Sequence, residues 1–178
     1  MRRAALCLAC MAGLALAAAP ATEAGAGIAS TTAASADEAG PEAVAAAPDR
    51  LDEILPEAPL ILHLWATWCA PCRAELPELA DFRAALPASL KARLVVVSVD
   101  TRPRADVRRF LDADMDLPGF QTYRADPAEA GGRFQITGYP LTLFLDRDGA
   151  VTRRISGAAP WPDEGFRGQA IEHLGRGS

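Results

Sequence analysis

The sequence is constrained most by two cysteines placed where a buried strand meets a helix. Residues 60–66 read Leu-Ile-Leu-His-Leu-Trp-Ala, a short and mostly apolar run typical of a buried β-strand. Cys69 and Cys72 follow at once, and apolar residues then recur every three or four positions up to Leu86, as on one face of a helix. A strand that leads into Cys-x-x-Cys and a helix indicates a redox site.

The rest of the chain alternates strands and helices. Residues 94–99 predict a second buried strand, and the helix between the two strands favours a right-handed parallel crossover. The remaining elements are predicted as a helix from Pro103, a strand over 120–123, a helix ending near Phe134, a hairpin of strands 141–146 and 151–156, and a helix over 162–174. This order predicts an α/β domain with a mixed sheet and helices on both faces.

Two local patterns bear on the helices. Asp126 and Pro127 supply a cap and a first helical residue, and we expect Glu129 to complete the cap as the reciprocal acid. Pro77 removes one backbone hydrogen bond from the helix after the cysteines. We expect it to bend that helix without ending it.

The amino-terminal residues resemble an export signal followed by a linker. Two arginines precede an apolar stretch over residues 4–19, and small residues near position 20 offer a cleavage site. The next segment is rich in Ala, Gly, Ser, Thr and Pro, a composition that cannot offset the entropy of folding. We predict a signal peptide or membrane anchor over 1–21, a disordered Ala/Pro-rich linker over 22–48 and a folded domain over 49–178.

The charge of the chain argues against a nucleic-acid partner. The formal net charge is -5, and the arginines are scattered among Asp and Glu. Binding to phosphates requires a clustered basic surface, which this pattern lacks.

The two cysteines are suited to different steps of thiol–disulfide exchange. Cys69 stands where the helix begins, and the free backbone N–H groups and helix dipole there favour its thiolate. Cys72 lies one turn further along, close enough to form a disulfide with Cys69 and to resolve a mixed disulfide. A static disulfide across so short a loop would add little to the stability of the fold. A structural zinc site would need more ligands than this sequence offers near the two cysteines. We therefore predict a redox-active pair and no metal or other cofactor.

Three segments together suggest a family. Residues 65–77 (Trp-Ala-Thr-Trp-Cys-Ala-Pro-Cys-Arg-Ala-Glu-Leu-Pro) resemble the active-site segment of the TlpA/ResA/CcmG family of membrane-tethered or periplasmic thioredoxin-like proteins. Residues 138–149, which begin Gly-Tyr-Pro, resemble the cis-proline loop and hairpin of that family, and residues 156–161 resemble TlpA in particular. The likeness covers residues 58–174, although residues 49–59 are too few for the β-hairpin that many relatives carry there.

The resemblance implies a fold, a reaction and partners. The fold would be thioredoxin-like, with a strand-helix element inserted before the cis-proline loop. The protein would be a monomer in the periplasm, released after signal cleavage or tethered by residues 4–21, and would reduce cysteine pairs of exported proteins. The implied clients are copper-handling factors, an oxidase subunit or apocytochromes c, and a membrane thiol-reductant donor would restore the dithiol.

The resemblance also assigns supporting residues. Pro140 would be cis and would place the backbone beside Cys69 for pairing with an extended client. The residues expected to contact the client are Trp68, Ala70, Pro71, Tyr139, Pro140 and Trp161.

Two further residues are candidates for proton transfer. Glu75 follows Cys72 by three positions and could take its proton, or could instead be an exposed acid that complements the helix dipole. His63 stands where thioredoxin has a buried carboxylate, and it could act as a base for Cys72 or be a satisfied core histidine.

Two other functions remain open for the same cysteines. A copper-binding chaperone could use both as soft ligands. A general oxidase or isomerase of exported proteins would differ in its reduction potential. Peroxidase activity is not expected, because that chemistry uses a single-cysteine arrangement.

Overall fold

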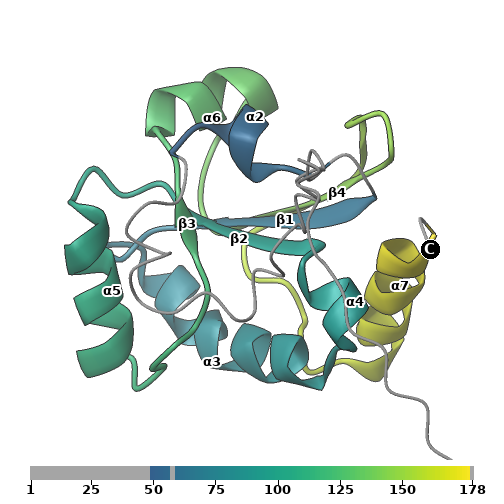
Figure 1. Ribbon diagram of the computed structural model, residues 1–178, viewed down its shortest axis with the longest axis horizontal. Coiled ribbons are helices and arrows are strands. Elements are labelled where there is room, and N and C mark those ends of the chain that lie inside the picture. The colour runs from purple at the N-terminus through teal and green to yellow at the C-terminus, as the bar shows by residue number, and fades with distance from the viewer. Residues whose placement is uncertain (1–48, 57–58, 177–178) are drawn as a thin grey trace, which may run out of the picture. The chain divides into compact units, whose positions relative to one another are not determined.

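A mixed five-stranded sheet organises the residues described by the computed structural model, which are 49–56 and 59–176 (Figure 1). The strands follow the order β3-β2-β1-β4-β5 across the sheet. The predicted signal segment and linker lie outside the described residues. Within the described part of the chain, no helix is both long enough and apolar enough to cross a bilayer.

The strands combine parallel and antiparallel pairs, as expected. They are β1 (Leu60–Trp65), β2 (Leu94–Ser98), β3 (Tyr123–Arg124), β4 (Leu141–Leu145) and β5 (Val151–Ser156). β2 is parallel to both β1 and β3, whereas β4 is antiparallel to β1 and β5. Every residue of β1, β2 and β4 is buried, which explains their nearly continuous apolar sequences.

The predicted helices are present, together with two short ones that the pattern did not indicate. The helices are α2 (Leu51–Ile54), α3 (Ala70–Ala85), α4 (Ala88–Lys91), α5 (Arg104–Ala113), α6 (Pro127–Phe134) and α7 (Glu164–Gly175). Figure 1 shows α2 and α6 on one side of the sheet and α3, α4 and α7 on the other. Since α2 and α4 each have four residues, they are too short to show a helical period.

Helix α3 packs against the sheet through the predicted stripe. Leu76, Leu79 and Phe82 are fully buried, and α3 continues through Pro77 as expected. The ring of Phe82 stacks on Trp161, with centroids 5.3 Å apart. This stripe joins the active-site helix to the core of the domain.

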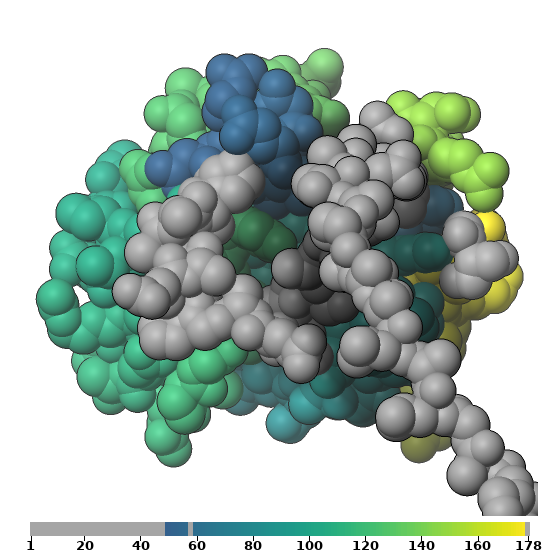
Figure 2. Space-filling view, viewed as in Figure 1, coloured from purple at the N-terminus to yellow at the C-terminus, as the bar shows by residue number. Residues whose placement is uncertain are grey.

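Glu129 does not have the expected role. Asp126 caps α6 by accepting hydrogen bonds from the backbone N–H groups of Ala128 and Glu129. The Glu129 carboxylate instead accepts from the backbone N–H of Leu51, at 3.2 Å, at the start of α2. Figure 2 shows α2 lying against α6. Tertiary packing therefore directs the Glu129 side chain to α2, although the local sequence predicts that it caps its own helix.

His173 links α7 to the sheet through its imidazole ring. It is buried, and its Nε2 atom lies 2.9 Å from the carbonyl oxygen of Leu145 and 3.2 Å from that of Leu60. One imidazole thus contacts the ends of two central strands.

We expect Phe82→Ala to lower the free energy of unfolding by about 3–5 kcal/mol, because it removes a buried ring and leaves a cavity beside Trp161. Asp81→Ala, at an exposed neighbouring position, should change it by less than about 0.5 kcal/mol. Urea denaturation of both variants measures the difference. A loss below about 1 kcal/mol for Phe82→Ala would contradict this packing.

Candidate active site

Cys69 occupies the N-cap position of α3. Its backbone is extended, with φ -87° and ψ 105°, and its Sγ atom accepts a hydrogen bond from the backbone N–H of Cys72 at 3.2 Å. Pro71 stands in the first turn, where it has no N–H to leave unpaired. The sulfur therefore takes the place that an N-capping oxygen usually fills, and the helix start favours negative charge on it.

The two sulfurs are joined in a disulfide, but their surroundings differ. The Cα atoms of Cys69 and Cys72 are 5.2 Å apart. Cys69 retains 6% exposure and Cys72 has none, while the neighbouring Trp68 is 62% exposed. This difference supports Cys69 as the attacking residue and Cys72 as the resolving residue.

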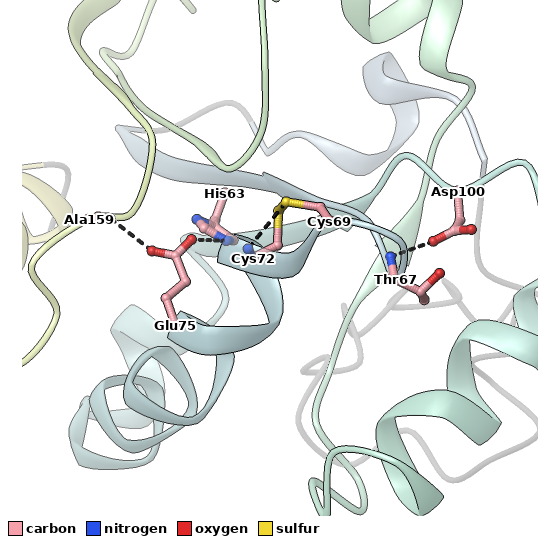
Figure 3. The surroundings of a disulfide bond; sticks show 7 residues. All are labelled: His63, Thr67, Cys69, Cys72, Glu75, Asp100 and Ala159. Atoms are coloured by element: carbon pink, nitrogen blue, oxygen red, sulfur yellow. Dashed lines mark hydrogen bonds and ion pairs between the residues drawn. A yellow bond between two sulfur atoms is a disulfide. The ribbon is translucent and has the colours of Figure 1, made fainter.

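A buried carboxylate that sequence reasoning missed holds the loop before Cys69. Asp100 Oδ2 accepts the backbone N–H of Thr67 at 2.7 Å (Figure 3). Its Oδ1 accepts a hydrogen bond from Nε of Arg102 at 3.1 Å. Burial alone would raise the pKa of Asp100, but the bonds from Thr67 and Arg102 outweigh it and keep that pKa below its usual value. The signal was available, because a polar residue after β2 must lie beside the residues that follow its parallel neighbour β1.

A second polar group lies behind Cys72. His63 from β1 and Glu75 from α3 face one another, with Nε2 and Oε1 3.2 Å apart (Figure 3). His63 Nδ1 lies 3.0 Å from Thr142 Oγ1, and Glu75 Oε2 accepts the backbone N–H of Ala159 at 2.8 Å. Glu75 is only 3% exposed, so the alternative of an exposed acid that complements the dipole is wrong.

Burial shifts the pKa values of this pair in opposite directions. It raises the pKa of Glu75 to about 7 and lowers the pKa of His63 to about 3, because an apolar interior disfavours the charged form of each group. The hydrogen bond from Ala159 offsets part of the rise for Glu75. Near neutral pH, His63 is uncharged and Glu75 can either accept or release a proton.

Trp161 does not lie where a client could touch it. The side chain is fully buried, stacks on Phe82 and meets the edge of His63 with ring centroids 5.8 Å apart. The expectation of a client contact is therefore wrong for this residue. The ring fills the space between α3 and α7, where it also packs edge-on against Phe166.

The other expected client-contacting residues lie around Cys69 but not all in one surface. The Tyr139–Pro140 bond is cis, as the resemblance implied. Pro140 is itself buried, Ala70 is exposed, and Tyr139 packs edge-on against Trp68 at 5.8 Å.

A groove opens beside the Cys69 sulfur. Its volume is about 540 Å³, and its lining is Trp68, Cys69, Pro71, Pro127, Gly131, Ile136, Thr137, Gly138 and Tyr139. None of these residues carries a formal charge. Pro127 and Gly131 belong to α6, so the strand-helix insertion expected before the proline loop forms one wall of the groove.

A mixed sheet flanked by helices, with a dithiol at the start of a helix and a cis-proline beside it, defines the thioredoxin-like class. The sequence profile of the AhpC/TSA family matches residues 41–159, and the chain belongs to that family, within its thioredoxin-like ResA/CcmG/DsbE group. Closeness to TlpA in particular stays a prediction.

Individual relatives agree with this assignment. The chain is 33% identical over 99 residues to the thiol:disulfide interchange protein DsbE homolog of Paracoccus denitrificans, covering 54% of this chain and 50% of that one. It is 31% identical over 99 residues to the thiol-disulfide oxidoreductase ResA of Oceanobacillus iheyensis, covering 56% and 50%. The chain thus spans about half the length of these curated relatives.

A solved structure shows the same fold. A crystal structure described as a thiol:disulfide interchange protein DsbE from Chlorobium tepidum superimposes with a TM-score of 0.51 at 27% identity. The match covers 67% of this chain and 82% of that one.

The His63–Glu75 pair makes a testable contribution to stability. Between about pH 4.5 and 6.5 the folded pair carries one proton, on Glu75, and the unfolded pair also carries one, on His63. The two contributions to the pH dependence of stability therefore nearly cancel in the wild type. Single substitutions should expose each of them.

In Glu75→Gln, the unfolded chain binds more protons than the folded one below pH 6.5 because of His63. The free energy of unfolding should then fall, relative to the wild type, by about 1 kcal/mol per pH unit as the pH drops from about 6.5 to about 4.5. In His63→Asn it should fall instead as the pH rises from 4.5 to 7, because only the folded chain retains the Glu75 proton. Urea denaturation across this range gives the slope of unfolding free energy against pH for each variant. If both variants had the slope of the wild type, the opposite pKa shifts of the buried pair would be contradicted.

Proposed function

We propose that this protein reduces disulfide bonds of exported client proteins through Cys69 and Cys72. The observation that carries the proposal is the position of Cys69 Sγ, which caps α3 beside an uncharged groove while Cys72 lies buried one turn behind it. Membership of the thioredoxin-like group supports thiol–disulfide exchange as the reaction.

The exchange takes two displacement steps. The Cys69 thiolate attacks one sulfur of the client disulfide, forms a mixed disulfide and releases the other client sulfur as a thiolate. Cys72 then attacks Cys69 Sγ, which closes the Cys69–Cys72 disulfide and releases the second client thiolate. The client gains two electrons from the dithiol, and an external dithiol donor must reduce the pair before the next cycle.

Cys72 must lose its proton before the second step. Glu75 lies three residues further along α3, and Figure 3 shows its carboxyl group and the His63 ring on the Cys72 side of the disulfide. We assign Glu75 as the proton acceptor, with His63 holding its carboxylate. A buried acid with a pKa of about 7 is suited to accept this proton and later release it.

We infer a periplasmic location and clients of the kind that the resemblance implies. The apolar stretch within residues 4–21 would export the chain and would then be cleaved or remain as an inner-membrane tether. The clients would be copper-handling factors, an oxidase subunit or apocytochromes c, with a membrane thiol-reductant as electron donor. Relatives named DsbE, HelX and ResA support a role of this kind.

Replacing Cys72 with Ser should stop the reaction at the mixed disulfide, because no thiol remains to attack Cys69 Sγ. Full-length Cys72→Ser protein in the native periplasm should yield covalent adducts that dithiothreitol releases, and mass spectrometry identifies the partner. Cys69→Ser is the control and should form none. Absence of adducts in Cys72→Ser, or equal adducts in both variants, would overturn the proposed reaction.

The groove can be blocked from one helical position. A Cβ atom added at Gly131 or at Gly132 meets no atom within 4 Å, but only Gly131 lines the groove. Gly131→Leu should lower kcat/KM for insulin reduction about tenfold and leave reduction of the small disulfide cystine nearly unchanged. Gly132→Leu is the matched control and should retain both activities. Equal insulin activity in the two variants would show that clients do not use this groove.

A further inference from the structure

We propose that Thr142 is a positioning residue that fixes which ring nitrogen of His63 carries the proton and thereby keeps Glu75 ready to accept the proton of Cys72. The inference rests on the proposed function of the site. Thr142 belongs to β4, far along the chain from the cysteines. It would join His63 and Glu75 as a residue that supports proton transfer from Cys72.

The sheet register places Thr142 directly opposite His63. β4 runs antiparallel to β1, and these two residues are Cα partners in the pairing. Opposite residues project from the same face of a sheet, so both side chains reach the space below α3. Both are fully buried, with Oγ1 and Nδ1 3.0 Å apart.

Counting donors and acceptors selects one arrangement of protons. A threonine hydroxyl has one proton to donate, and among the described residues the hydrogen bond of the Thr142 side chain is the one to His63. If the hydroxyl donates to Nδ1, the imidazole proton must be on Nε2, where it faces Glu75 Oε1 at 3.2 Å. The hydroxyl proton then has an acceptor, and the Nε2 proton faces the carboxylate of an ionised Glu75.

The other tautomer leaves polar groups unsatisfied. With the proton on Nδ1, His63 would donate to Oγ1, and the hydroxyl proton of Thr142 would lose its acceptor in a fully buried position. The bare Nε2 atom would then face the carboxylate unless Glu75 were protonated. Since leaving a buried donor without an acceptor is unfavourable, Thr142 favours the arrangement with ionised Glu75.

The proton transfer that this arrangement prepares is balanced. The Cys72 thiol gives its proton to the Glu75 carboxylate and becomes a thiolate, and no electrons move in this step. The groups that face the pair come from four parts of the fold: β1, β4, α3 and the loop before α7. They are His63, Thr142, Glu75, the nearby charge of Glu78, the Ala159 N–H and the Trp161 ring.

The test uses Thr142→Val, which removes the hydroxyl with little change of shape, and Thr142→Ser, which retains it. Thr152→Val is the control, because Thr152 is an exposed threonine of β5 that bonds only a backbone carbonyl among the described residues. Nitrogen NMR of the full chain, labelled at histidine, reports which nitrogen of His63 is protonated. Above pH 7, where Glu75 is ionised, the wild type, Thr142→Ser and Thr152→Val should carry the proton on Nε2, and Thr142→Val should show both tautomers.

Insulin reduction across pH provides the functional readout. In Thr142→Val the pH at which activity rises should move up by about one unit, because ionised Glu75 loses support. Thr142→Ser should restore the wild-type profile, which a merely structural role for the residue would not require.

Two results would overturn the inference. One is a wild-type His63 that carries its proton on Nδ1 above pH 7, a result that needs no variant. The other is a Thr142→Val protein with the tautomer and pH profile of the wild type. If Cys72→Ser still traps clients in either case, the proposed function survives and the role of Thr142 fails, whereas loss of trapping would remove the function itself.

Discussion

The site depends on one hydrogen bond, from the backbone N–H of Cys72 to the sulfur of Cys69. By capping α3 with sulfur, the fold gives Cys69 the partial positive charge of a helix start without any cationic side chain. The same turn places Cys72 within bonding distance of Cys69, on the buried side. Attack and release are therefore assigned to the two cysteines by helix geometry.

Buried polar groups hold this helix start from two sides, at a cost to stability. Asp100 holds Thr67 in front of the disulfide, while Glu75 and His63 lie behind it. Removing such groups from water is unfavourable unless each finds a partner. Among the described residues, Nε2 of His63 and Oε1 of Glu75 have no hydrogen-bond partner, although the two atoms lie 3.2 Å apart. Apolar side chains would suit the core better there, which argues that the pair is retained for proton transfer.

The inserted helix α6 connects α2 to the groove. Its Gly131 leaves space beside Cys69, and its Glu129 carboxylate caps α2. Glycine in a helix interior costs about 0.5–1 kcal/mol relative to alanine, so the bare wall of the groove is maintained against helix propensity. The hydrogen bond between Glu129 and Leu51 packs α2 against α6 and offsets part of this loss of helix stability.

The sequence by itself determined the order of the strands and of the four longer helices, the buried stripe of α3 and the position of Cys69 at the start of that helix, because periodicity and helix ends are local properties. Only the tertiary structure decided that Trp161 is buried, that Glu129 caps another helix, and that Asp100 and Thr142 serve the site. Glu129, Asp100 and Thr142 bond partners that are 33 to 79 positions away. Such pairings arise when strands come into register and helices pack, and no local pattern encodes them.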